Sequence, residues 1–210
     1  MKAAVAVALM AKAPVPGLAK TRLIPALGAA GAAALAQRLL DHAVAQALAA
    51  AVGPVTLWCA PDCAHASFEA LRLRHGIGLA QQQGVDLGHR MHHIFERAAG
   101  PLLLMGTDLP GLDADAIGQA AMRLLDHEAV FVPALDGGYG LVGLRLPCAR
   151  LFHDMRWSTP RVMAETRERL ALAGLSHFEL PALQDIDEPA DLTHLGADWR
   201  AATLVSERPQ

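Results

Sequence analysis

The sequence predicts an α/β domain of three layers, in which helices cover both faces of a mostly parallel β-sheet. Short apolar runs alternate along the chain with segments of helical periodicity, a pattern typical of strands joined by crossover helices. Hydrophobic residues make up 53% of the chain and charged residues 19%, which is enough to bury a core and too little charge for disorder. The length of 210 residues favours one domain. We expect it to span residues 1–205, with a frayed tail at 206–210.

The expected strands are short apolar runs bounded by Gly, Pro or polar residues. The first alternates Val with Ala and leads directly into a loop containing Pro and Gly, which indicates a buried strand rather than a signal sequence. In chain order we predict strands at Ala3 to Met10, Val55 to Ala60, Ile77 to Gln81, Leu102 to Met105, Ala129 to Pro133, Tyr139 to Leu144 and Ser176 to Leu180.

The expected helices have recognisable start and stop signals. Gly53 and Pro54 end the first, which is rich in alanine, and Asp113 is a natural N-cap for the fourth. We predict helices at Gly28 to Ala51, Ala64 to Arg74, Leu87 to Ala99, Asp113 to Asp126 and Pro160 to Ala173, and a further one that begins at Glu188-Pro189.

Composition excludes several classes of protein. A net charge of −3 and an aromatic content of 4% argue against a nucleic-acid-binding surface. The sequence contains no uninterrupted apolar run of the roughly 20 residues that a membrane span requires. The three cysteines, Cys59, Cys63 and Cys148, have no second Cys or His pair at zinc-binding spacing and are expected to be reduced thiols. We therefore expect a cytoplasmic protein whose partners include neither nucleic acid nor membrane.

Ligands of open α/β sheets bind beyond the carboxyl ends of the strands, so we expect functional residues on the loops that leave those ends. The loop after the first strand carries Lys12, Lys20 and Arg22 on a segment stiffened by prolines, and Gly17 allows a ligand to approach its backbone. Cations and free N–H groups together suit a phosphate chain. The alternative is a solvated basic loop.

Carboxylates follow two other predicted strands. Asp108 comes directly after a buried strand, where a lone carboxylate suits Mg²⁺. Asp185 and Asp187 alternate along an extended segment, so one of them could complete a metal site begun by Asp108. Asp113 and Asp115 form an Asp-x-Asp pattern, but helix capping explains both.

Three further segments could contact a ligand. Asp136-Gly137-Gly138-Tyr139 lies between two strands and is either a hairpin turn or a ligand-binding loop. The segment from Gln81 to Gly88 offers amides that could bind a base or ribose. Trp157-Ser158-Thr159 precedes Pro160, where Ser or Thr is a candidate N-cap.

Taken in order, these motifs resemble the DUF2064 family over nearly the whole chain, from Lys12 to about Leu192. The family consists of bacterial glycosyltransferase A-like proteins in the GT-A nucleotide-diphospho-sugar transferase superfamily. The sequence is more distantly similar to 2-phospho-lactate guanylyltransferases and molybdopterin nucleotidyltransferases. The resemblance rests on Lys20-Thr21-Arg22-Leu23, Thr107-Asp108-Leu109-Pro110, Asp136-Gly137-Gly138-Tyr139, Trp157-Ser158-Thr159 and Asp185-Ile186-Asp187-Glu188-Pro189-Ala190-Asp191-Leu192.

The resemblance implies a Rossmann-like, GT-A-type nucleotide-binding fold and a role for each motif. Catalytic residues would be Lys20, Arg22 and Asp108, and Mg²⁺ or Mn²⁺ would bind Asp108 and Asp187, with Asp185 as the alternative to Asp187. Nucleotide-binding residues would be Lys12, Gly17, Lys20, Arg22, Gln83, Gly84, Asp86 and Thr107. Acceptor-binding residues would be Asp136, Gly137, Gly138, Tyr139, Trp157, Ser158 and Thr159.

The function favoured by the sequence is metal-dependent nucleotidyl transfer from a nucleoside triphosphate to a small phosphorylated or hydroxyl acceptor. Three cations on one loop suit a triphosphate better than a diphosphate that a metal already neutralises. Glycosyl transfer from a sugar nucleotide is the second hypothesis, and nucleotide binding without turnover is the third.

Overall fold

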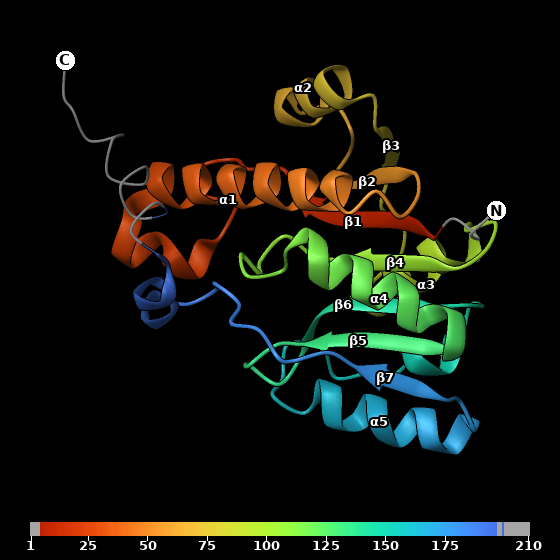
Figure 1. The fold of residues 1–210 in the computed structure, drawn as a ribbon. Coiled ribbons are helices and arrows are strands. Elements are labelled where there is room, and N and C mark those ends of the chain that lie inside the picture. Colours follow the sequence, from red (N-terminus) through yellow and green to blue (C-terminus); the bar gives the residue numbers. More distant parts are fainter. Residues whose placement is uncertain (1–4, 197–198, 200–210) are drawn as a thin grey trace, which may run out of the picture.

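The computed structural model describes residues 5–196 and residue 199, so the expected tail at 206–210 and the boundary at 205 lie outside the described residues. Seven strands form one sheet in the order β3-β2-β1-β4-β6-β5-β7 (Figure 1). Only β6 runs antiparallel to its neighbours, β4 and β5. The strands are β1 (Ala6–Lys12), β2 (Val55–Ala60), β3 (Gly78–Gln81), β4 (Leu102–Met105), β5 (Ala129–Pro133), β6 (Tyr139–Leu144) and β7 (His177–Glu179).

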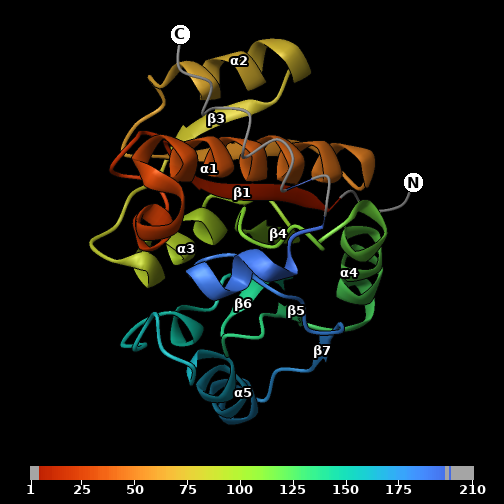
Figure 2. The same cartoon turned by 90° about the vertical axis from the view of Figure 1, so that its left-hand side faces the viewer.

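Helices cover both faces of the sheet, which confirms the predicted three-layer α/β fold (Figures 1 and 2). One face packs against α1 (Ile24–Ala49), α2 (Ala66–His75) and α4 (Ala114–Asp126). The other packs against α3 (Leu87–Glu96) and α5 (Val162–Ala173). The part of the chain that the structure describes also contains three short 3-10 helices: η1 (Thr21–Leu23), η2 (Ala149–Leu151) and η3 (Pro189–His194).

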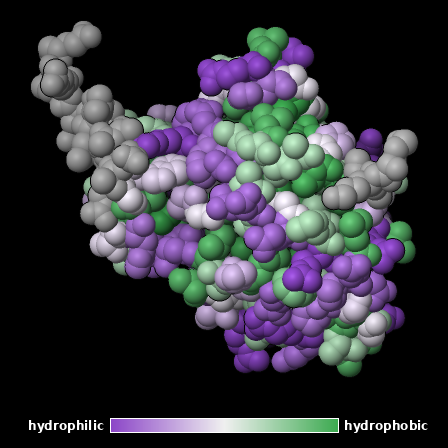
Figure 3. All heavy atoms as spheres, viewed as in Figure 1, coloured by the Kyte–Doolittle hydropathy of each residue, from purple (hydrophilic) through white to green (hydrophobic). Residues whose placement is uncertain are grey.

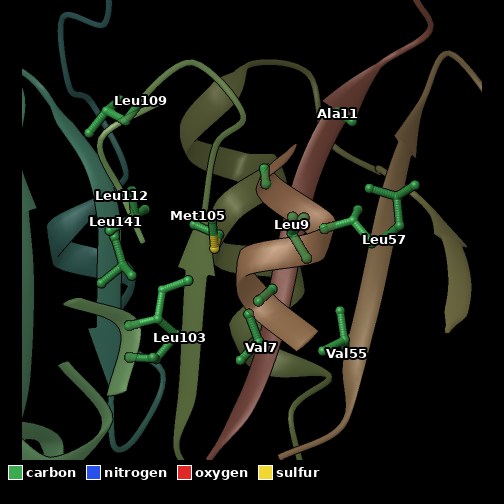
Figure 4. Close-up of a cluster of buried hydrophobic side chains, with 14 of the residues drawn as sticks. Val7, Leu9, Ala11, Val55, Leu57, Leu103, Met105, Leu109, Leu112 and Leu141 are labelled. Atoms are coloured by element: carbon green, nitrogen blue, oxygen red, sulfur yellow. The ribbon is translucent and has the colours of Figure 1, made fainter. Parts of the chain in front are cut away.

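The core follows from the alternation of side chains along each strand. On β1, Val7 and Leu9 enter the cluster beneath α1, while Ala8 between them enters the cluster on the opposite face. Figure 4 shows how β1, β2 and β4 contribute side chains to the first cluster. Because both faces of the central strands are buried, their sequences are continuously apolar, as a parallel sheet requires.

Helix α1 begins earlier than its alanine pattern indicates. Its first turn starts at Ile24, where Pro25 is tolerated, and Gly28 then interrupts the helical geometry with φ 68°. By length and apolar composition the segment Thr21–Ala49 could cross a membrane, but here it packs against the sheet. Its exposed positions are mainly alanines, and apolar residues lie between α1 and α2 in Figure 3. A core helix accounts for the segment.

The four strands predicted at residues 55–60, 102–105, 129–133 and 139–144 are confirmed. Strand β1 runs on to Lys12, so Lys12 ends the strand and the prediction that it lies in the following loop was wrong; residues 3 and 4 of the predicted strand lie outside the described residues. Helix α3 ends at Glu96 rather than Ala99, and the helix predicted to begin at Glu188-Pro189 is the short 3-10 helix η3. Asp113 caps α4 as expected, with its carboxylate 2.8 Å from the amide nitrogen of Ala116. Helix α5 begins at Val162 with Arg161 as its N-cap, so the prediction that Ser158 or Thr159 caps it was wrong. The hydroxyl of Thr159 donates instead to the carbonyl of Arg156, at 2.9 Å.

Candidate active site

A cavity of about 550 Å³ opens at the carboxyl ends of β1 and β4. Figure 2 looks onto this edge of the sheet, where η3 lies beside the start of α1. The cavity is where an open α/β sheet binds its ligands. It is lined by many of the predicted site residues: Lys12, Lys20, Arg22, Thr107, Asp108, Asp136, Gly138, Tyr139, Trp157, Ser158, Thr159, Asp185 and Asp187.

Lys20 and Arg22 face the carboxylates of two other loops. The ammonium of Lys20 lies 2.6 Å from Oδ1 of Asp108 and 3.7 Å from Oδ1 of Asp187. Arg22 donates to Oδ2 of Asp187 at 2.7 Å. The Lys20 side chain is 7% exposed, whereas that of Asp108 is 47% exposed. The basic loop is therefore not solvated throughout, because its central lysine is held in an ion pair inside the cavity wall.

A backbone hydrogen bond joins the loop that carries Asp108 to the segment that carries Asp187, and it positions both carboxylates. The amide of Ile186 donates to the carbonyl of Asp108 at 2.9 Å. The Ile186 side chain is fully buried in a cluster with Leu23 and Leu39, so its neighbours in this extended segment turn toward the cavity. In the adjoining helix η3, Asp191 and Glu188 form a capping box, so Asp191 is a structural residue.

Asp185 and Asp187 have different surroundings. Asp187 contacts the two cations, but burial raises the pKa of Asp185, and the nearby carboxylates of Asp136, Asp191 and Asp187 raise it further. Asp187 is therefore the better placed of the two to share a cation with Asp108.

Replacing Asp185 by Asn is expected to stabilise the metal-free protein at neutral pH. The raised native pKa means that ionised Asp185 is less favourable in the folded state than in the unfolded one. In EDTA at pH 7 the variant should melt roughly 1–3 °C above wild type. That difference should disappear as the pH falls through the raised pKa and below the unfolded value, at about 3.9. A gain that persists at pH 3 would contradict the electrostatic origin.

Another part of the cavity wall contains residues expected to bind an acceptor. The Tyr139 ring lies edge-on to Phe131 and Trp157, with ring centroids 5.3 and 6.4 Å apart. Asp136 accepts from the amide of Gly138 at 2.7 Å and so shapes the turn between β5 and β6. Ser158 lies in this wall with φ 60°, a left-handed backbone conformation that is uncommon for a residue other than glycine.

Tyr139 contributes its ring rather than its hydroxyl. Burial raises the pKa of the Tyr139 phenol, and among the described residues the hydroxyl meets no hydrogen-bond partner. Because an unsatisfied buried hydroxyl is costly, Tyr139→Phe is expected to retain wild-type stability or gain up to about 1 kcal/mol in urea unfolding. A loss of more than about 1 kcal/mol would mean that the hydroxyl is satisfied in solution.

Five of the predicted residues do not line the cavity. Asp86 is the N-cap of α3 and accepts from the amide of His89 at 2.8 Å, and Gly84 packs against the same helix turn. Gly137 packs against the backbone of Pro160 instead of facing a ligand. The remaining two are Gly17 and Gln83. The structure thus gives these five residues no part in the cavity wall.

Several cavity residues were missed by sequence analysis. Leu87 and Met91, one turn apart at the start of α3, form an apolar part of the wall. The Asp86 capping signal places this helix end, and the spacing of the two residues puts them on one face. Gln82, not Gln83, connects the ends of two strands, because its amide donates to the carbonyls of Ala11 and Trp58.

The donor set fits a hard divalent cation. Two carboxylates, of Asp108 and Asp187, and the carbonyl of Ile186 surround one position, which the Lys20 ammonium occupies. Within the described residues no three His, Cys, Asp or Glu side chains cluster as a metal site would require. Proteins commonly hold Mg²⁺ by one or two carboxylates together with substrate phosphates and water, so the oxygen donors of Asp108 and Asp187 could serve such a site only if a ligand supplied the remaining oxygens.

Residues 40–159 match the profile of a family described as an uncharacterized protein conserved in bacteria, DUF2064. The chain belongs to the DUF2064 family. The match covers more than half of the chain, and the resemblance drawn from the loop motifs is thereby confirmed. No protein of curated function matches the sequence significantly.

Three solved structures illustrate what this DUF2064 protein is similar to. One, described provisionally as a nucleotide-diphospho-sugar transferase of Desulfovibrio desulfuricans G20, is 29% identical with a TM-score of 0.83, covering 96% of this chain and 94% of that one. CMP:2-keto-3-deoxy-manno-octonic acid synthetase, solved with CTP, is 14% identical with a TM-score of 0.57, covering 97% and 99%. The 4-diphosphocytidyl-2C-methyl-D-erythritol synthase of Anaerococcus prevotii DSM 20548 is 8% identical with a TM-score of 0.57, also covering 97% and 99%. The DUF2064 chain therefore has a nucleotidyltransferase-like or GT-A-like fold.

Proposed function

We propose that this protein is a divalent-metal-dependent nucleotidyltransferase, which transfers a nucleoside monophosphate from a nucleoside triphosphate to a small phosphorylated or hydroxyl acceptor. The observation that carries the proposal is the meeting of Lys20, Arg22, Asp108 and Asp187 at the carboxyl edge of the sheet. Two cations and two carboxylates at the mouth of one cavity suit a ligand that brings both negative charge and a metal ion.

The residues of this wall would bind and orient the triphosphate. Lys20 and Arg22 would donate to its phosphate oxygens and stabilise the pyrophosphate that leaves, with Lys12 at the end of β1 as a further cation. Thr107, beside Asp108, offers a hydroxyl to the same region. Asp108 and Asp187 would hold Mg²⁺ or Mn²⁺, which when bound neutralises phosphate oxygens.

An acceptor would bind against the wall formed by Tyr139, Trp157, Ser158 and Thr159. Its attacking oxygen would have to approach the α-phosphorus opposite the leaving pyrophosphate, so the protein mainly positions the two reactants.

Glycosyl transfer from a sugar nucleotide is the second candidate. It is favoured by the Desulfovibrio protein, which is described as a nucleotide-diphospho-sugar transferase. In that case Asp108 and Asp187 would hold the metal of a diphosphate, and the acceptor wall would contact the sugar.

A ligand screen tests the two candidates. The melting temperature is measured with the four nucleoside triphosphates and with UDP-, GDP- and CMP-sugars, each with and without Mg²⁺, because a ligand stabilises the state that it binds. Nucleotidyl transfer predicts the largest shift for one triphosphate in the presence of Mg²⁺. A shift with sugar nucleotides alone would favour glycosyl transfer, and Mg²⁺-independent binding without product would indicate a binding protein.

Arg22→Ala is expected to weaken binding of the best triphosphate by roughly tenfold. A charge-assisted hydrogen bond contributes about 1.5–3 kcal/mol, and Arg22 must first leave Asp187, so the lower end of this range applies. Arg72→Ala is the matched control, because Arg72 pairs with Glu69 at 2.5 Å on the exposed surface of α2, away from the cavity lining. Equal affinities of both variants in isothermal titration would contradict a phosphate-binding role for Arg22.

A further inference from the structure

The positive charge between the carboxylates of Asp108 and Asp187 is the ammonium group of Lys20. The Lys20 ammonium donates to the carbonyl of Ile186 at 2.6 Å and lies 2.6 Å from Asp108. With 7% of its side chain exposed, Lys20 is the shielded member of the group, while the carboxylates open to the cavity. Its charge offsets the repulsion that two carboxylates in one site would otherwise cause.

The backbone at Lys20 is shaped for this contact. Lys20 adopts φ 46° and ψ 46°, a left-handed conformation that costs a residue with a Cβ some free energy and persists where its surroundings hold it. Its carbonyl accepts from the amide of Leu23 at 2.8 Å, which starts η1, and Leu23 is fully buried. Lys20 is therefore fixed through its side-chain contacts with Ile186 and Asp108 and through its backbone contact with Leu23, and it is not a residue of a loose surface loop.

We propose that Lys20 is an internal counter-ion that occupies the divalent-cation position, and that it must leave before the cation can bind. The inference rests on the proposed function, which requires a metal at Asp108 and Asp187. A cation bound at about 2.1 Å from carboxylate oxygens would lie against the ammonium that is already 2.6 Å from one of them. Two positive charges at such a separation repel strongly, so the two occupants exclude each other.

Two consequences follow from this exchange. A divalent metal alone binds the wild-type protein weakly, because it must break the contacts of Lys20 with Asp108 and Ile186. Once released, the ammonium faces a cavity whose proposed ligand carries phosphates, so metal and polyphosphate assist each other's binding. Lys20 thereby couples the two ligands without itself contacting the metal.

The test uses Mn²⁺ alone, titrated into the full-length protein and followed by electron paramagnetic resonance. Lys20→Met, which keeps the length of the side chain and removes its charge, is expected to bind Mn²⁺ at least tenfold more tightly than wild type, the equivalent of about 1.4 kcal/mol. Adding Asp108→Asn to Lys20→Met should abolish the gain. Lys12→Met is the matched control, because Lys12 lines the same cavity yet forms no ion pair with the carboxylates among the described residues, and it should gain less than threefold.

A second measurement on wild type keeps the test valid if Lys20→Met does not fold. Mild acylation followed by peptide mass spectrometry should show Lys20 protected in EDTA and labelled several-fold faster as Mn²⁺ is added, with Lys12 unchanged. Mn²⁺ binding that leaves Lys20 protected, or equal Mn²⁺ affinities of Lys20→Met and wild type, would overturn the exchange.

If Lys20→Met gains affinity for Mn²⁺ while no nucleotide binds any variant, the exchange holds and the proposed function fails. If nucleotide binds with metal while Lys20→Met gains nothing, only the exchange fails.

Discussion

Asp108→Asn is expected to remove the metal-dependent part of nucleotide binding and to lower any transfer rate by roughly 10²–10³-fold or more. Asparagine keeps the shape of the side chain but loses the charge that a divalent cation and Lys20 both require. The fold should survive, because the carboxylate is half exposed and Lys20 retains the carbonyl of Ile186. We expect a loss of about 1 kcal/mol in stability.

Asp115→Asn is the matched control for this variant. Asp115 lies in the first turn of α4 and does not line the cavity. The Asp115→Asn protein should therefore bind nucleotide in the presence of Mg²⁺ as tightly as wild type. Isothermal titration of the best nucleotide, with and without Mg²⁺, separates the two variants. If Asp108→Asn strongly destabilises the fold while the metal affinity of the folded protein is unchanged, Asp108 is a structural residue.

Gly137→Ala is expected to have the largest effect on stability. Gly137 has φ 92°, and a Cβ at this position would lie 2.2 Å from the carbonyl oxygen of Pro160. The amide of Met163 also donates to the Gly137 carbonyl at 2.8 Å, so the backbone cannot move away without loosening the start of α5. Strain and overpacking together should cost about 3 kcal/mol or more, which lowers the melting temperature by roughly 6–12 °C.

Gly118→Ala is expected to stabilise the protein, in contrast to Gly137→Ala. Gly118 lies inside α4, and no atom lies within 4 Å of a Cβ placed there. Alanine should therefore stabilise the helix by up to about 1 kcal/mol. The melting temperatures of the two variants test how closely each glycine is packed. A Gly137→Ala protein as stable as wild type would show that the turn before β6 has room for a Cβ.

The strands could be predicted well because burial on both faces leaves a plain sequence signal. Leu102 to Met105 and Ala129 to Pro133 are continuous apolar runs with clear limits, and both match the structure residue for residue. Helix ends were harder to predict, because they depend on tertiary contacts. Gly28 indicated a helix start, yet Ile24 and Pro25 form an earlier turn that packs beside η3.

The candidate site was predictable where a residue follows a strand directly. Loops that leave the carboxyl ends of strands are where a site was expected, and the structure brings Lys20 and Asp108 from two such loops to 2.6 Å of each other. Gly84 and Asp86 lie further along a loop, where local capping of α3 decides their place. Sequence alone also could not indicate that Lys20 would lie between the carboxylates, since that depends on Ile186 bringing the last segment of the chain back to Asp108.

The most direct measurement of nucleotidyl transfer is the detection of the pyrophosphate that the reaction releases. Purified protein is incubated with Mg²⁺, each γ-labelled nucleoside triphosphate in turn and a small-molecule extract of bacterial cells, and the labelled product is identified by chromatography. The proposed function predicts labelled pyrophosphate from one triphosphate, formed only when the extract supplies an acceptor and not formed by Asp108→Asn. Absence of pyrophosphate from every triphosphate, together with release of a nucleoside diphosphate when a sugar nucleotide replaces the triphosphate in a parallel incubation, would contradict it.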